Sequence, residues 1–294
     1  MPATEERAAG VALTLASAAS FGAMAIFAEA AYDSGAEPLG VLAFRFPIAA
    51  VVLAALVAVR GVPSIPPHRV AGLLAAGGIG YTLQAITFFT ALEHAPAGLV
   101  ALLLYLYPAI VTVLAAALLR QRLTRRRAGG VALALAGTAL TVGPSSGGRP
   151  LGIALGIAAA CVYSVYILVN TRLTHGVDAI AASALVCAGA SVSTGAVALV
   201  VRPDVPGTAT GWVAVVAIAV VCTVVAIATF FGGLRRLGPS DTATLSTFEP
   251  VVTVALAAIV LGDRVGALQL LGGAVILTAV VILSRAPAPS DATR

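Results

Sequence analysis

The sequence has few charged residues and no lysine. Charged residues occupy 10% of its 294 positions, and all 17 basic residues are arginines. A phosphate-binding loop needs a lysine, so an ATP-driven pump is excluded. Hydrophobic residues reach 60% and the mean hydropathy is +1.05, values far from those of a soluble globular domain. The composition therefore predicts an integral membrane protein embedded in the lipid bilayer.

Residues that bind metals or form disulfides are also scarce. The three cysteines lie in apolar runs without CxxC or metal-ligand spacing, and we interpret them as small buried hydrophobic side chains: Cys161, Cys187 and Cys222. The three histidines are isolated near the ends of predicted helices, which argues against a zinc site or a metalloprotease. We therefore predict no metal, no cofactor and no enzymatic activity.

Ten apolar runs are long enough to cross a hydrocarbon layer of about 30 Å as helices. They lie near residues 11–31, 38–59, 70–92, 97–118, 127–142, 152–172, 179–201, 212–234, 240–261 and 266–284. The predicted fold class is an all-α integral membrane protein with ten transmembrane helices. An N-terminal tail (1–10), an external linker (143–151) and a C-terminal tail (285–294) complete the chain.

The arginines predict the orientation in the membrane. With the N-terminus inside, thirteen arginines fall in cytoplasmic segments, three fall in external loops, and Arg45 lies within the membrane. This excess predicts a multi-pass protein of the cell (inner or plasma) membrane with both termini in the cytoplasm. We interpret the basic cluster Arg120–Arg127 as a topology anchor, so no nucleic-acid partner is predicted.

The chain resembles itself, without a gap, at a shift of 142 residues. The shift aligns Gly10 with Gly152, Thr87-Phe88-Phe89 with Thr229-Phe230-Phe231, Pro108 with Pro250, and Arg122 with Arg264. The units 11–142 and 152–284 each hold five predicted helices, and an odd number means that the second unit enters the membrane from the opposite side. Inverted repeats are a hallmark of secondary transporters, whose substrate sites lie near the midplane beside broken helices. Pro108 and Pro250 are the matched helix breaks.

Features of the two units resemble the EamA family of the drug/metabolite transporter superfamily. They are Glu249-Pro250-Val251-Val252, Leu261-Gly262-Asp263-Arg264, Arg45 in the second helix, and glycine pairs in the last helix of each unit. The resemblance covers about residues 10–284. It implies a transporter of amino acids and other small metabolites, with a central cavity lined mainly by helices 1, 3, 4, 6, 8 and 9. The first unit departs from the pattern, because Arg120-Gln121-Arg122 stands where the family usually has Gly-Glu-Arg.

Glu249 and Pro250 stand in the middle of the ninth apolar run. A charged side chain at a helix centre costs roughly 2.5 to 3.5 kcal/mol on insertion scales, which makes an intramembrane acid a functional-site hypothesis. Pro250 lacks an amide hydrogen, so we expect a kink that frees a backbone carbonyl beside the acid. One helix face, predicted to line the cavity, carries Thr242, Ser246, Glu249 and Thr253.

Arg45 is the second intramembrane charge. Counting the helix rise from the membrane boundaries places it roughly 6 Å from the level of Glu249, a distance that a long side chain could cover. Glu29, near the outer end of the first helix, is the rival partner. Arg45 is either a member of a structural ion pair or a clamp for a substrate carboxylate, and the sequence leaves both readings open.

Hydroxyl and amide side chains are predicted near the same level. They are Gln84 and Thr87 on the third helix, Tyr105 and Tyr107 on the fourth, Tyr163, Tyr166 and Asn170 on the sixth, and Ser246 on the ninth. Each could bind a substrate or a proton, or could only form hydrogen bonds between helices. Tyr107 is the repeat partner of Glu249, so the two units carry different side chains at the position of the acid. A site for an asymmetric substrate requires such a difference.

Together these patterns predict a secondary transporter, an exporter of small metabolites such as amino acids or amphipathic amines. It would work by alternating access around a midplane cavity. The expected partners are a small-molecule substrate and the lipid bilayer, with proton coupling and a homodimer left open. A passive channel or facilitator is the main alternative, followed by a non-transporting membrane scaffold or sensor.

Overall fold

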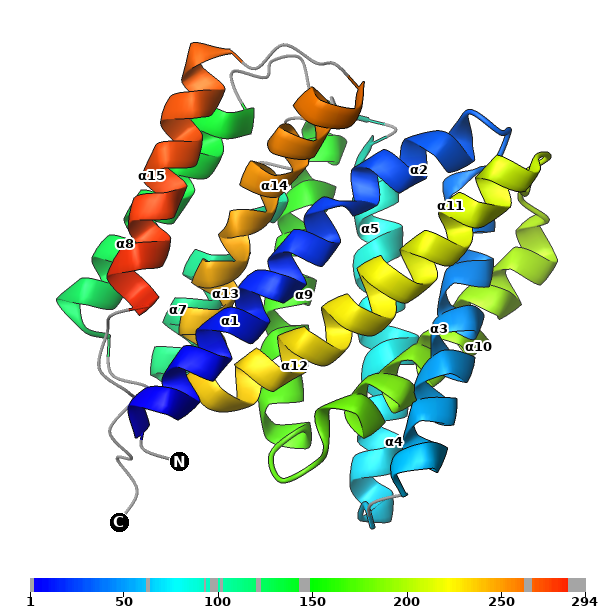
Figure 1. Cartoon of the computed structure of the whole chain (residues 1–294), viewed down its shortest axis with the longest axis horizontal. Coiled ribbons are helices and arrows are strands. Elements are labelled where there is room, and N and C mark those ends of the chain that lie inside the picture. Colours follow the sequence, from blue (N-terminus) through cyan, green and yellow to red (C-terminus); the bar gives the residue numbers. More distant parts are fainter. Residues whose placement is uncertain are drawn as a thin grey trace.

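The structure is a computed structural model that describes residues 3–61, 64–92, 94–95, 100, 103–119, 123–142, 149–261 and 266–284. All regular secondary structure in these residues is helical, so the predicted all-α class is confirmed. The helices pack into one bundle (Figure 1).

The chain alternates long helices with short irregular turns of helix. Its first half contains α1 (Ala3–Gly22), α2 (Met24–Tyr32), α3 (Pro38–Arg60), α4 (Pro67–Ala75), the π-helical η1 (Ala76–Tyr81), α5 (Thr82–Leu92), α7 (Tyr107–Leu118) and α8 (Arg125–Val142). Its second half contains α9 (Pro150–Leu173), α10 (Ala179–Val201), α11 (Ala209–Ala219), the π-helical η2 (Val220–Val225), α12 (Ala226–Leu237), α13 (Pro239–Leu245), the 3-10 helix η3 (Ser246–Phe248), α14 (Glu249–Leu256), the π-helical η4 (Ala257–Leu261) and α15 (Ala267–Ser284).

Seven helical stretches of the described chain are long and apolar enough to cross a membrane, and two shorter apolar helices, Tyr107–Leu118 and Leu270–Ile282, accompany them. A helical segment lies within each of the ten predicted runs. Ten crossings and an inverted repeat stay predictions. Most of the predicted external linker, the residues around Asp263 and the predicted C-terminal tail lie outside the described residues.

Prolines and polar caps mark where helices begin. Four helices start with a proline, whose missing amide hydrogen is not needed in a first turn: Pro38, Pro67, Pro150 and Pro239. The Asp178 carboxylate caps α10 by accepting the amides of Ile180 and Ala181. Gly238 ends α12 with a φ of 77°, which lets the chain turn directly into α13.

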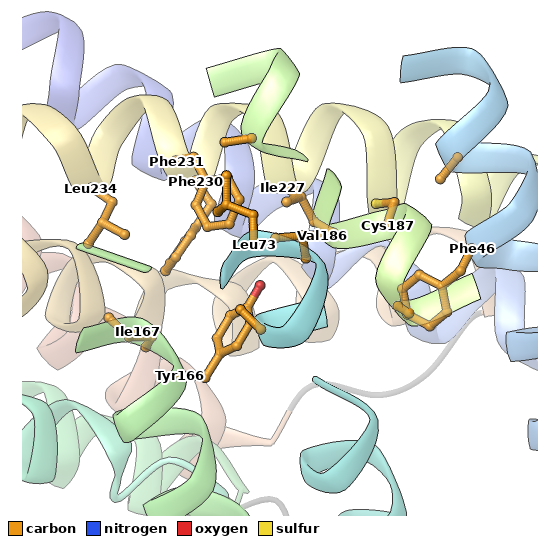
Figure 2. Packing of buried hydrophobic residues seen from close by; sticks show 14 of the residues in the cluster. Phe46, Leu73, Tyr166, Ile167, Val186, Cys187, Ile227, Phe230, Phe231 and Leu234 are labelled. Carbon is orange, nitrogen blue, oxygen red and sulfur yellow. The ribbon is translucent and has the colours of Figure 1, made fainter. Parts of the chain in front are cut away.

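The core forms where helices from both halves of the chain meet (Figure 2). Fully buried side chains of this core include Phe46, Leu73, Ile167 and Phe231. Small residues allow close backbone approach: a Cβ on Gly77 would lie 1.9 Å from the Val186 carbonyl oxygen, and one on Gly189 would lie 2.0 Å from that of Leu74. The contact between η1 and α10 therefore depends on glycine at these two positions.

One end of the bundle is rich in arginine. Arg7 at the start of α1 and Arg127 at the start of α8 both contact Asp241 in the first turn of α13. Arg126 donates to the carbonyl of Ile282 near the end of α15. We call this side the arginine-rich end and the opposite side the distal end. The sequence predicts that the arginine-rich end faces the cytoplasm.

Candidate functional site

The helix that carries Glu249 is interrupted immediately before Pro250. The α13 helix gives way to the 3-10 turn η3 over Ser246–Phe248, and α14 starts at Glu249. The carbonyl of Ser246 accepts the amide of Glu249 because Pro250, its usual partner four residues on, has no amide hydrogen. The chain therefore tightens by one residue at the point where it places the acid.

The corresponding segment before Pro108 is also irregular. A turn at Tyr105 and Leu106 precedes α7, and the amides of Ala109 and Ile110 both bond to the Leu106 carbonyl. Tyr105 and Tyr107 therefore stand at this irregular turn, as Glu249 stands at the other.

The half-buried Glu249 carboxylate lies beside tyrosines. The Tyr105 hydroxyl lies beside the Glu249 side chain. Tyr107 is 3% exposed, donates to the Ala243 carbonyl at 3.2 Å, and lies beside the Ser246 side chain. Among the described residues, Glu249 makes no ion pair within 4.0 Å, although Arg45 is near enough to influence it electrostatically.

Five tyrosines form a continuous series of ring contacts. The centroid distances along the series are 6.5 Å from Tyr105 to Tyr107, 4.9 Å from Tyr107 to Tyr163, 6.0 Å from Tyr163 to Tyr166, and 5.9 Å from Tyr166 to Tyr81. Tyr81 then meets Phe46 edge to face at 5.1 Å. The series thus begins at Glu249 and ends beside Arg45, the residue next to Phe46.

Arg45, which is 4% exposed, is held by neutral acceptors. Its Nε donates to Thr223 Oγ1 at 2.6 Å, and its Nη2 donates to the Cys222 carbonyl at 3.1 Å and to the Tyr81 hydroxyl at 3.5 Å. Both second-half partners belong to η2, where π-helical pairing changes which carbonyls are available. The guanidinium also lies 5.1 Å from the Phe46 ring centroid.

Arg45 and Glu249 do not form a direct ion pair. Within the described residues, ion pairs at 4.0 Å or less join Asp241 to Arg7 and to Arg127. The acid and the base instead stand at the two ends of the tyrosine series. Glu29, the rival partner, is an exposed residue of α2.

The remaining predicted residues lie at different distances from this cluster. Ser246 is buried beside Tyr107 and donates to the Thr242 carbonyl. Asn170 is fully buried but donates to the Tyr166 carbonyl of its own helix, a contact within α9. Gln84 is half-buried on α5 and takes part in none of the contacts given above.

Sequence reasoning missed Tyr81, Thr223 and Asp241. Tyr81 and Thr223 lie in π-helical turns, which no simple periodicity marks. Asp241 had a clear signal, because it is an acid at the start of the ninth apolar run. Arg127 was interpreted only as part of a topology anchor, and that interpretation was incomplete, since its side chain is buried against Asp241. Cys161 was expected to be buried and is exposed.

Comparisons with known proteins agree with this arrangement. The model of the EamA-like transporter family matches residues 8–143 and matches again at residues 150–285. The chain belongs to this family. This EamA-like transporter is 28% identical over 283 residues to the uncharacterized transporter YcbK of Bacillus subtilis (strain 168), which covers 91% of this chain and 90% of that protein. The predicted family is therefore confirmed.

Two further relatives of this EamA-like transporter are informative. It is 26% identical over 175 residues to the aromatic amino acid exporter YddG of Ancylobacter novellus, which covers 58% of this chain and 60% of that protein. A solved structure described only as "Crystal structure of protein" matches with a TM-score of 0.81 at 22% identity, covering 93% of this chain and 95% of that one. The second likeness shows the fold alone.

Proposed function

We propose that this EamA-like transporter is a secondary exporter of small metabolites that carry an amino group, such as amino acids or amphipathic amines. The observation that carries the proposal is the placement of Glu249, an acid at a helix interruption that lies beside tyrosines and within the electrostatic influence of Arg45 but makes no direct ion pair with it. An intramembrane acid without a direct ion pair can bind a cation, take up a proton or meet water.

The tyrosine series suits the substrate that such an acid would bind. An ammonium group near Glu249 would also meet the faces of Tyr105 and Tyr107, and a cation over an aromatic ring gains about 0.5 to 2 kcal/mol. An apolar or aromatic body could then lie along Tyr163 and Tyr166. The name of the relative YddG, an aromatic amino acid exporter, supports this class of substrate.

Alternating access would expose this site to each side of the membrane in turn. In this proposal the two matched five-helix units form an inverted repeat of ten crossings, with both termini in the cytoplasm. Glu249 would exchange the substrate cation for a proton, which couples export to the proton gradient.

The test is transport by purified protein in proteoliposomes with Glu249→Gln. This change keeps the shape of the side chain and removes its charge, so we expect a folded protein that loses at least about tenfold in transport, as when a charge-assisted contact is removed. Glu29→Gln is the matched control, because Glu29 is an exposed acid outside the tyrosine cluster. It should transport at the wild-type rate.

The same assay separates the alternatives. Counterflow of labelled amino acids or amines distinguishes a transporter from a scaffold or sensor. Saturation and dependence on a pH gradient distinguish it from a passive channel or facilitator. Wild-type transport by a folded Glu249→Gln protein would remove the acid from the mechanism.

A further inference from the structure

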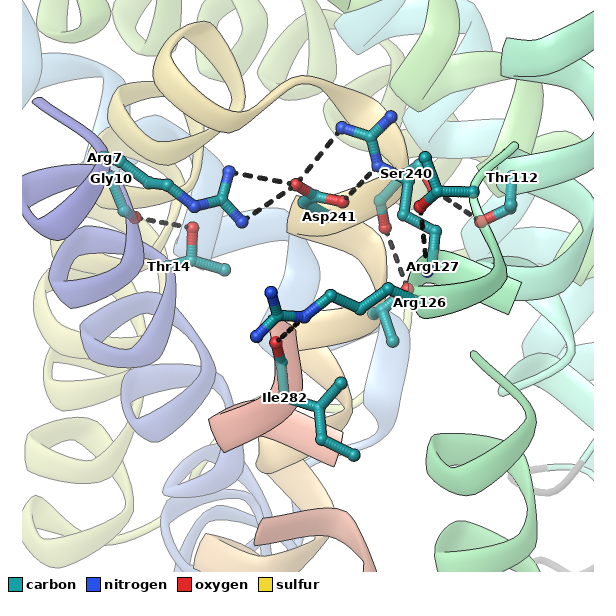
Figure 3. A network of polar contacts seen from close by, with 11 residues as sticks. Arg7, Gly10, Thr14, Thr112, Arg126, Arg127, Ser240, Asp241 and Ile282 are labelled. Atoms are coloured by element: carbon teal, nitrogen blue, oxygen red, sulfur yellow. Dashed lines mark hydrogen bonds and ion pairs between the residues drawn. The ribbon is translucent and has the colours of Figure 1, made fainter. Parts of the chain in front are cut away.

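A second buried acid lies on the same helix as Glu249, at the arginine-rich end. Asp241 is fully buried, and its Oδ2 accepts Arg7 Nη1 and Nη2 at 3.2 Å each. Arg127 Nε donates to the other oxygen, Oδ1, at 2.8 Å, and Arg127 Nη2 lies 3.4 Å from Oδ2. Figure 3 shows the carboxylate between the two guanidinium groups. We call Arg7, Asp241 and Arg127 the ion triad.

The ion triad joins the two halves of the chain. Asp241 belongs to α13 in the second half, whereas Arg7 belongs to α1 and Arg127 to α8 in the first half. A hydrogen bond of 2.7 Å between Ser240 and Thr112 ties the same turn of α13 to α7 (Figure 3). The start of α13 is therefore fixed to three helices of the first half through polar contacts.

The segment between the ion triad and Glu249 is buried. Every residue of 240–247 is at most 6% exposed. Glu249 lies eight residues beyond Asp241, about 12 Å along the helix. A cavity of about 340 Å³ lies at the arginine-rich end, and its lining includes Glu6, which precedes Arg7, and Gly238, which precedes α13. The buried segment 240–247 lies between this end of the bundle and Glu249, and the ion triad holds its first turn against α1 and α8.

Stability alone gives little reason to keep such a group of charges. A buried ion pair repays its desolvation poorly, and apolar side chains of similar volume often stabilise a fold as well or better. An ion pair is suited to a contact that must open and close, because its charges regain hydration when water enters. When these helices separate, the free energy lost from charge pairing is offset by the hydration free energy of the exposed charges. Because the two free energies are similar in size, the step is reversible.

The repeat-related positions do not carry the same residues. At the shift of 142 residues, the counterparts of Arg7, Asp241 and Arg127 are Arg149, Leu99 and Gln269, a set without an acid. The internal repeat therefore does not duplicate the ion triad.

From these observations we infer that the ion triad is the gate that closes the path from the arginine-rich end to Glu249. This inference rests on the proposed transport function. The gate must open each time the site faces the predicted cytoplasm.

The test measures access to the buried segment and does not require transport. Thr242→Cys places a thiol one residue beyond Asp241, at a buried side chain whose Oγ1 has no hydrogen-bond partner. The three native cysteines are replaced by alanine. A membrane-impermeant thiol reagent is then applied to inside-out and to right-side-out vesicles, and the rate of modification is measured.

Asp241→Asn should accelerate modification from the arginine-rich end by about tenfold or more, because the closed state then buries two arginines without their carboxylate. Asp33→Asn, the same change at an exposed acid after α2, should leave the rate unchanged. An unchanged rate in a folded Asp241→Asn protein would overturn the gate.

A second variant covers the case in which Asp241→Asn does not fold. The triple variant Arg7→Gln, Asp241→Asn, Arg127→Gln strands no charge and should give the same acceleration. If neither variant folds, the ion triad is a folding element and the inference is wrong. If the labelling results contradict the gate, the Glu249→Gln transport test still decides the proposed function. The two proposals can therefore be refuted independently.

Discussion

The hydrogen bond between Arg45 and Thr223 tests whether Arg45 is held by the protein or kept for a substrate. The Nε to Oγ1 distance is 2.6 Å, and the two residues are 4% and 0% exposed. Thr223→Val preserves the shape of the side chain and removes the hydroxyl that accepts from the guanidinium. A hydrogen bond to a charged group contributes about 1.5 to 3 kcal/mol, so we expect a loss of stability of that size.

Thr229→Val is the control for the substitution itself. Thr229 is half-buried on α12, and its hydroxyl bonds only to the backbone carbonyls of Val225 and Ala226. Thr223 also donates to a local carbonyl, that of Ile218, so the control reproduces this part of the change. The control should shift stability by no more than about 0.5 kcal/mol.

The contact between Arg45 and Thr223 is isolated by thermal unfolding in detergent. The melting temperature is measured for each threonine variant in the wild-type protein and again in an Arg45→Met background. Thr223→Val should lower the melting temperature by several degrees in the wild-type background and by little more than Thr229→Val when Arg45 is absent. An equal effect in both backgrounds would show that the hydroxyl does not act through Arg45. A stable Thr223→Val protein with a raised KM would instead assign Arg45 to substrate binding.

Two further predictions concern topology and movement. A cysteine placed at Ser146 should be labelled from outside the cell and one at Arg126 should not; the opposite pattern would overturn the predicted orientation and the inverted repeat. Pro250→Ala restores an amide that can reach the Ser246 carbonyl, so it should favour a continuous helix in place of the η3 turn and slow transport more than it lowers the melting temperature. A folded Pro250→Ala protein with wild-type transport would mean that the interruption serves packing alone.

Composition and the lengths of the apolar runs were sufficient for the all-helical class, because a membrane permits few alternatives. Any backbone in the hydrocarbon layer must satisfy its own polar groups, so apolar runs of about 20 residues predict helices. Pro250 likewise predicted the irregular turn beside Glu249, because a missing amide removes a hydrogen bond within the same helix.

The sequence did not predict which groups contact the charged side chains inside the bundle. Counting helix rise placed Arg45 and Glu249 at similar depths, but depth does not say which side chains face each other. The π-helical turn η2 rotates Thr223 and the Cys222 carbonyl toward Arg45, and such a turn has no sequence period. The pairing of Asp241 had a sequence signal, because this acid stands at the start of the ninth apolar run, at the end where the sequence predicts Arg7 and Arg127.

The two acids of this helix differ in what surrounds them, and that difference assigns them opposite tasks. Asp241 is fully buried with two guanidinium groups supplied by the protein, so its charge is balanced before any ligand arrives. Glu249, about 12 Å further along the helix axis, makes no ion pair within 4.0 Å and lies beside the Tyr105 hydroxyl, with Arg45 near enough to influence it electrostatically. A carboxylate in a membrane without a directly paired charge is costly, and that cost can be relieved by a cation or proton from outside the protein. Asp241 is therefore suited to hold helices together, and Glu249 is suited to bind what the protein carries.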